Sequence, residues 1–271
     1  MKTNALTGTI LFLLLVAMMS SCNQAPKSGH DSETIAEAVD YTEFRNEFLE
    51  LIRDSPKGID DADFLASVGA SYVDDITLPL IYAEKAETRN EIALVTGMYI
   101  MDVYYANAFG RYDVVLKNVK VVDQLVDKLG VFHDRVGYAG IDLYENNKDS
   151  INAFILRDWH YGHNYTASGD HPEVLAMVFV GTNIEAMYLL SQLTLYAKDS
   201  QAMTDHLMQK GQHAGLLLRL LEILSADEAI APYYEKLQPV VAFFETRETI
   251  DHDDLVELAA LIESIRNKVI S

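Results

Sequence analysis

Apolar residues recur at three- and four-residue spacing along most of the chain, which is the periodicity of helices that bury one face. Strands with one buried face would instead alternate apolar and polar residues, and no convincing stretch of this kind occurs. The pattern therefore predicts an all-α protein.

Capping residues, glycines and prolines mark the expected ends of these helices. The predicted helices cover residues 34–53, 60–75, 84–109, 112–129, 135–145, 149–161, 172–197, 200–224, 227–247 and 251–269. Asp60 is expected to cap the second helix, and Ser225 to open a capping box before the ninth. Gly110 and Gly130 are expected to end the third and fourth helices.

Two segments, 92–109 and 174–190, are apolar on every side, which is typical of helices buried at the centre of a protein. Four residues of the first region recur 84 positions later, namely Gly97, Ile100, Tyr104 and Tyr112 as Gly181, Ile184, Tyr188 and Tyr196. Either a duplicated helical hairpin or coincidence between two tyrosine-rich core helices explains this match. In both cases Gly97 and Gly181 should mark close helix crossings, because mid-helix glycine costs about 1 kcal/mol without a packing reason.

The expected fold is an irregular multi-helix bundle of antiparallel helical hairpins around these two central apolar helices. No strict 34-residue period is visible, so a regular tetratricopeptide array is not supported, while a looser TPR-like array stays open. Residues 34–271 are expected to form a single all-helical domain, since about 250 residues are enough for a substantial core.

The N-terminal segment combines a charged start, Lys2, with a short apolar run from Ile10 to Met19. This run is shorter than the about 20 residues of a membrane-spanning helix and predicts a secretory signal. The step Met19-Ser20-Ser21-Cys22 resembles a bacterial lipobox, in which the signal is removed before a cysteine that is then lipidated. An ordinary signal peptide followed by a free thiol is the alternative.

Cys22 is the only cysteine of the chain, so it has no partner for an internal disulfide and stands where lipidation needs it. We therefore expect a lipoprotein signal peptide over residues 1–21, and the lipidated Cys22 with a flexible tether over residues 22–33. This predicts a protein of the cell envelope, anchored by lipid to the outer membrane on its periplasmic side or at the cell surface.

The net charge of the chain limits the kinds of partner that it can bind. Removing residues 1–21 takes away one positive charge, Lys2, and leaves 20 Lys and Arg against 41 Asp and Glu, a net charge of −21. Such a chain repels phosphate backbones, which argues against nucleic-acid binding. It also repels anionic lipid, so the acyl chains and not a basic patch would hold it to the membrane.

Several short blocks follow one another in an order found in one protein family. They are Gly97-Met98-Tyr99-Ile100-Met101-Asp102-Val103-Tyr104-Tyr105, Gly110-Arg111-Tyr112, Lys128-Leu129-Gly130, Asn147-Lys148-Asp149-Ser150 and Gly181-Thr182-Asn183-Ile184-Glu185-Ala186-Met187-Tyr188. Over about residues 90–190 the chain resembles uncharacterised all-helical lipoproteins of Bacteroidota, some of which carry tryptophan where Asn183 stands. The resemblance implies an all-α fold and an envelope location, and it implies no known activity.

Asp102 and Glu185 are lone carboxylates within the two apolar segments. A buried carboxylate must be paired, hydrogen-bonded, protonated or solvated, because leaving it bare costs many kcal/mol. Together with Tyr105 and Asn183 they are candidates for a polar ligand pocket between the central helices. The alternative, which we favour, is a buried network that fixes helix register.

The segment 158–171 is rich in histidine and tyrosine. His160 and His163 share a helix face at i, i+3 and, with His171, could ligate a metal, although Gly162 is expected to end the helix between them. Tyr161 and Tyr165 are candidates for the rim of a binding cleft.

No nucleophile elbow and no phosphate-binding loop occurs, and no cofactor is predicted. We therefore expect a binding or scaffolding role for a small ligand, a glycan fragment or a partner protein of the envelope, and favour a non-enzymatic protein. The alternative is a metal-dependent or hydrolase-like enzyme that uses the buried carboxylates or the cluster of His160, His163 and His171.

Overall fold

The computed structural model describes residues 46, 48, 58–130, 149–151, 153, 172–197, 201–225, 228 and 230–270. The chain divides into two units, Met1–Ala36 and Glu37–Ser271, and all described residues belong to the second. Of the part that the structure describes, 83% is helical and none is strand, which confirms the all-α multi-helix bundle.

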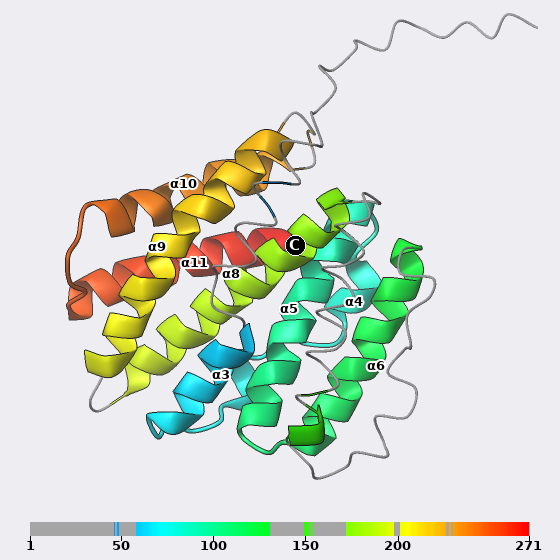
Figure 1. The fold of residues 1–271 in the computed structure, drawn as a ribbon, viewed down its shortest axis with the longest axis horizontal. Coiled ribbons are helices and arrows are strands. Elements are labelled where there is room, and N and C mark those ends of the chain that lie inside the picture. The colour runs from blue at the N-terminus through cyan, green and yellow to red at the C-terminus, as the bar shows by residue number, and fades with distance from the viewer. Residues whose placement is uncertain are drawn as a thin grey trace, which may run out of the picture. The chain divides into compact units, whose positions relative to one another are not determined.

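The helices follow one another along the described chain as shown in Figure 1. They are α3 (Gly58–Ser67), the 3-10 turn η1 (Asp74–Ile76), α4 (Tyr82–Lys85), α5 (Arg89–Ala108), α6 (Tyr112–Leu129), α8 (Pro172–Tyr196), α9 (Gln201–Leu224), α10 (Ala231–Glu245) and α11 (His252–Val269). The bounds of α6 agree with the sequence prediction, and those of α8, α9 and α11 agree within one residue.

Three predicted helix ends were wrong. The helix expected to reach residue 75 ends at Ser67, and Asp60 lies inside it instead of capping it. The helix expected from residue 84 begins at Arg89, because Thr88 and Glu91 form a capping box there. Ser225 opens no capping box for α10, which begins at Ala231; its hydroxyl donates to the Glu222 carbonyl at the end of α9 (2.6 Å).

Gly110 and Gly130 end their helices as predicted. Both adopt positive φ, 69° and 64°, a region that glycine enters without the steric cost that a Cβ would add. Gly110 brings the chain round from α5 into α6, so these two helices form an antiparallel hairpin (Figure 1).

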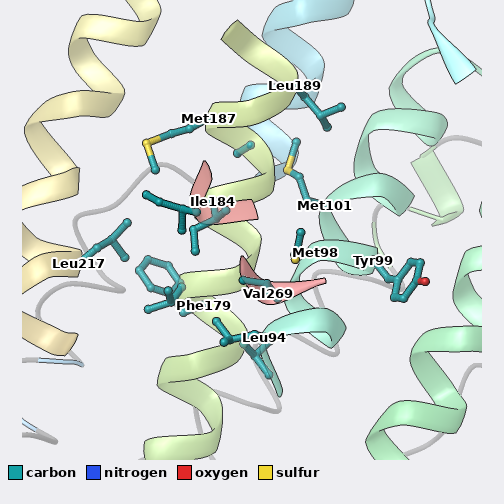
Figure 2. Packing of buried hydrophobic residues seen from close by; sticks show 14 of the residues in the cluster. Leu94, Met98, Tyr99, Met101, Phe179, Ile184, Met187, Leu189, Leu217 and Val269 are labelled. Carbon is teal, nitrogen blue, oxygen red and sulfur yellow. The ribbon is translucent and has the colours of Figure 1, made fainter. Parts of the chain in front are cut away.

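The two apolar segments form the central helices α5 and α8, which pack side by side (Figure 1). They run in the same direction: in Figure 2 the order from Leu94 to Met101 along α5 follows the order from Phe179 to Leu189 along α8. The stretch Glu173–Tyr196 is long and apolar enough to cross a membrane, but 89% of its most apolar window is buried inside the protein. Burial on this scale is what the core helix of a folded domain shows.

Glycine makes the contact between the central helices possible. A Cβ on Gly97 would lie 2.0 Å from the Val178 carbonyl oxygen, and a Cβ on Gly181 would lie 2.0 Å from the Leu94 carbonyl oxygen. Thr182 seals the crossing by donating its hydroxyl hydrogen towards the carbonyls of Gly97 (3.1 Å) and Val178 (3.0 Å). The predicted close crossing at Gly97 and Gly181 is therefore confirmed.

The same contact has an exchange symmetry. Gly181 lies 84 positions after Gly97, and Val178 lies 84 positions after Leu94, so each glycine meets the counterpart of the other's partner. A pseudo-two-fold axis along two parallel helices produces this exchange. Any two parallel helices that cross closely at level glycines make the same exchange, so the duplicated hairpin and coincidence both stay open.

Outer helices cover the central pair. α6 packs on α5, α11 packs on α8, and α9 and α10 pack on each other and extend the bundle away from the crossing (Figure 1). Gly211 of α9 lies against the ring of Phe244 of α10, where a Cβ would approach within 2.2 Å. The connection from α3 to α4 is irregular apart from η1, and it contacts α5 at Tyr99, Asp102 and Tyr105.

Candidate functional site: two buried carboxylates and the segment across them

Asp102 of α5 and Glu185 of α8 are both fully buried, with 0% of each residue exposed. The parallel course of the central helices brings the two carboxyl groups near enough to interact electrostatically. Two carboxyl groups buried close together need hydrogen bonds, a positive charge or a proton to offset the cost of burial.

Glu185 is compensated by Arg266 in the last turns of α11. The Arg266 Nε and Nη2 atoms donate to the two Glu185 carboxylate oxygens at 2.8 Å each, a bidentate pair. The guanidinium also lies 4.0 Å from the ring centroid of Tyr188, one turn after Glu185 on α8. Arg266 is itself 6% exposed, so this ion pair is removed from water.

Asp102 is compensated only in part. Its Oδ2 accepts a hydrogen bond from the backbone N–H of Leu78 at 2.8 Å. Its Oδ1 is buried and has no hydrogen-bond partner among the residues that the structure describes. The free oxygen sets Asp102 apart from Glu185, whose two oxygens are both bound.

Leu78 belongs to residues 72–79, a non-helical segment apart from η1, which we call the strap. Four buried or half-buried side chains bind the strap backbone. Val73 N–H donates to the Tyr105 hydroxyl oxygen (2.9 Å), Arg266 donates to the Ile76 carbonyl (3.2 Å), Leu78 N–H donates to Asp102, and the Tyr99 hydroxyl donates to the Pro79 carbonyl (2.8 Å). The buried polar residues thus satisfy backbone groups of a segment that forms no α-helix and no strand.

Sequence spacing explains how one helix reaches so much of the strap. Tyr99, Asp102 and Tyr105 follow at three-residue intervals on α5 and so lie along one face. Tyr72 stacks on the Tyr105 ring at 4.9 Å between centroids, and Arg111 caps the outer face of Tyr72 at 4.6 Å. The strap is therefore held by rings as well as by hydrogen bonds.

The low polarity of this site shifts the pKa values of its ionisable groups. Burial raises the pKa of Asp102 well above its usual value, and the neighbouring Glu185 adds to the rise, while the Leu78 N–H and Arg266 oppose it. Burial also raises the pKa of Glu185, which the Arg266 guanidinium partly offsets. Burial raises the pKa of the Tyr105 hydroxyl to about 12. The site therefore favours a neutral Asp102 beside a paired Glu185.

The predicted ligand residues fall into two groups. Asp102 and Tyr105 bind the strap directly and Glu185 is linked to it through Arg266, whereas Asn183 is 3% exposed and donates its amide hydrogen to the Phe179 carbonyl of its own helix (2.9 Å). Five of the predicted cleft and metal residues lie outside the residues that the structure describes, namely Tyr161, Tyr165, His160, His163 and His171.

Sequence reasoning missed Arg266 and the strap. The arginines that flank Asp102 in sequence do not pair with Glu185: Arg89 is exposed at the start of α5, and Arg111 binds Asp113 (3.4 Å) and Tyr72. A signal was present, because Arg266 stands among apolar neighbours at helical spacing near the end of α11. Arginine in an apolar stripe indicates a buried acidic partner.

A second buried charge cluster joins α3 to α9. Asp61 is 0% exposed and binds Lys210, which is 3% exposed, and its other oxygen lies 2.9 Å from Nε2 of His206. The His206 ring stacks on Phe64 at 4.0 Å between centroids. His206 and Lys210 are one turn apart on α9, so a single face of that helix binds both oxygens of Asp61.

Among the described residues no three His, Cys, Asp or Glu side chains gather in a way that could hold a metal ion. The chain matches no protein-family model, no curated protein and no solved structure.

Proposed function

We propose that this protein is a lipid-anchored scaffold of the bacterial cell envelope, which binds a partner protein through its surface. The observation that supports this proposal is the internal use of Asp102 and Glu185. Both are sealed from solvent, and their bonds go to the strap and to Arg266, in the manner of a structural network. A rigid all-α domain on a tether suits the holding of a partner near the membrane.

The anchor is carried by Cys22. The chain has no other cysteine, and the residues before it have the pattern of a lipobox. A strongly acidic domain gains nothing from anionic lipid headgroups, so acyl chains would provide the attachment, at about 0.8 kcal/mol for each buried CH₂.

Labelling and cross-linking of the full chain in cells test both halves of the proposal. A labelled fatty acid should enter the wild-type protein and be absent from Cys22→Ser, which should leave the membrane fraction. Cross-linking in intact cells should capture a partner with the wild type and equally with Asp102→Asn. Failure of the label would refute the anchor, and failure to capture a partner would refute the scaffold.

Thermal melts with sugars, small metabolites and divalent metals provide the opposing test. A ligand that binds the native state raises the midpoint, by about 2.7 kcal/mol of stability at one hundred times its Kd. The scaffold predicts no rise. A rise that disappears in Asp102→Asn would replace the scaffold with a ligand-binding function at this site, and a metal-specific rise would favour an enzyme or a metalloprotein.

A further inference from the structure

The strap is placed to respond to the charge of the side chain beneath it. Its outer residues Asp74, Asp75 and Pro79 are exposed, whereas Leu78 is 2% exposed and faces Asp102. Water therefore lies on one side of the strap and the buried carboxyl group on the other. Movement of the strap would be the direct route by which Asp102 gains solvent.

The charge balance under the strap depends on whether Asp102 is protonated. With Asp102 neutral, the described part of the site contains one carboxylate, Glu185, against one guanidinium, Arg266, and the bidentate geometry joins these two. With Asp102 ionised, two carboxylates share one guanidinium in a fully buried site. Oδ1, which has no hydrogen-bond partner among the described residues, would then be a bare anionic oxygen, which costs far more than an unpaired oxygen of a neutral acid.

We propose that the strap is a proton-coupled clamp, closed over Asp102 while that carboxyl group is neutral and released when it ionises. Release lets water reach the carboxylate and breaks the contacts that Asp102, Tyr99, Tyr105 and Arg266 make with the strap backbone. It exposes the aromatic face of α5 that Tyr72 now covers. The inference concerns the motion of this segment and does not depend on the partner of the scaffold.

The groups that act on Asp102 come from three helices and from the strap itself. They are Glu185 on α8, Arg266 on α11, Tyr99 and Tyr105 on α5, and Tyr72 on the strap. Burial also raises the pKa values of the three tyrosine hydroxyls. Glu185 raises the pKa of Asp102, and Arg266 opposes the rise without cancelling it.

The direction of the response follows from these shifts. The closed strap raises the pKa of Asp102, so closing is coupled to proton uptake, and rising pH favours the open form. Between the ordinary aspartate value of about 3.9 and the raised value of the closed form, the opening equilibrium should grow about tenfold for each pH unit. Above the raised value it should level off.

Hydrogen exchange of the full chain, followed by mass spectrometry across pH, measures this equilibrium once each rate is divided by its intrinsic value. The wild type should lose protection in the strap about tenfold per pH unit, while Asp102→Asn should keep constant protection, because asparagine is neutral and still offers an oxygen to Leu78 N–H. Asp75→Asn is the matched control, as it removes one exposed carboxylate from the strap and should leave the slope unchanged. A wild-type slope of zero, or an equal slope in Asp102→Asn, would overturn the clamp.

Two further readouts separate a local clamp from general unfolding. Amides of residues 92–101, at the helix crossing, should keep their protection over the same pH range; if they open with the strap, the clamp is overturned. Tyr105→Phe, which removes the acceptor for Val73 N–H without altering charge, should lower strap protection equally at every pH. Loss of the slope in Tyr105→Phe would also overturn the proposal, and this variant keeps the test available should Asp102→Asn fail to fold.

Discussion

Arg266 binds both carboxylate oxygens of Glu185 at 2.8 Å, across 81 positions of sequence, and so ties the C-terminal helix α11 to the central helix α8. The same guanidinium donates to the strap at Ile76. One buried side chain therefore connects three parts of the bundle that are distant in sequence. The interior of this domain is held by a polar junction as well as by its apolar core.

Removal of one member of this pair should be strongly destabilising. Arg266→Met leaves Glu185 buried without a cation, and breaking a buried pair in this way costs about 3–5 kcal/mol. Unfolding in denaturant should show the loss as a lower midpoint with an unchanged slope. The double variant Arg266→Met with Glu185→Gln should recover much of the lost stability, since no bare charge remains. If the double variant recovers no stability, the packing around Arg266 and not its charge is what stabilises the domain. The exposed Lys268→Met in the same helix should change stability by less than about 0.5 kcal/mol.

Alanine at the helix crossing should be poorly tolerated. In Gly97→Ala or Gly181→Ala the new methyl group would meet backbone carbonyl oxygens at 2.0 Å, and no rotamer change relieves a backbone clash. The central helices would have to separate, at a cost at or above the upper end of the roughly 1–3 kcal/mol typical of overpacking. Thermal unfolding measures the effect.

Gly215→Ala provides the matched control for that experiment. Gly215 lies in α9, where an added methyl group would meet no described atom within 4 Å. The substitution should gain about 0.5–1 kcal/mol, because alanine is the better helix former. If Gly97→Ala were as stable as Gly215→Ala, the close approach of α5 and α8 would be wrong.

The buried pair of Asp61 and Lys210 should matter as much as that of Glu185. Lys210→Met leaves Asp61 with His206 as its remaining side-chain partner among the described residues and should cost about 3–5 kcal/mol, measured by chemical unfolding. Arg219→Met on an exposed position of the same helix should be nearly neutral. A small loss at Lys210 would indicate that His206 compensates Asp61 by itself.

The sequence predicted the helices well where local rules decide them. Period, proline and glycine locate α6, α8, α9 and α11, and mid-helix glycine in an apolar segment is enough to identify the crossing at Gly97 and Gly181. Local rules failed at residues 68–81, where the apolar pattern continues although the chain is irregular apart from the 3-10 turn η1. There the conformation is set by tertiary contacts from Tyr99, Asp102 and Tyr105, which no local window contains.

The sequence predicted the two buried carboxylates of the candidate site but not the groups that bind them. A lone carboxylate in an apolar helix signals a buried group, so Asp102 and Glu185 were found. The partner of each lay beyond reach, because Leu78 contributes a backbone N–H that every residue except proline carries, and Arg266 comes from the far end of the chain. Periodicity predicts which face of a helix is buried, but it does not predict which other helix packs against that face.

Acid should act on the domain through the start of α5, in the opposite sense to Asp102. The N–H groups of Thr88 (3.0 Å) and Glu87 (3.2 Å) donate to the Glu91 carboxylate, and these bonds, that of Thr88 first, hold the pKa of Glu91 below its usual value. A lowered pKa in the folded state contributes stability that is present above the ordinary value of about 4.3 and is lost as pH falls through the folded value. The wild type should therefore lose more thermal stability between about pH 5 and about pH 3, a range that includes the ordinary glutamate value, than Glu91→Gln does. Thr88→Ala should remove the other half of the capping box at a cost of about 1 kcal/mol.

Glu87→Gln is the control, because it changes a neighbouring exposed carboxylate and should retain the acid sensitivity of the wild type. If Glu91→Gln were as sensitive to acid as the wild type, the capping box would not set the acid response of the domain.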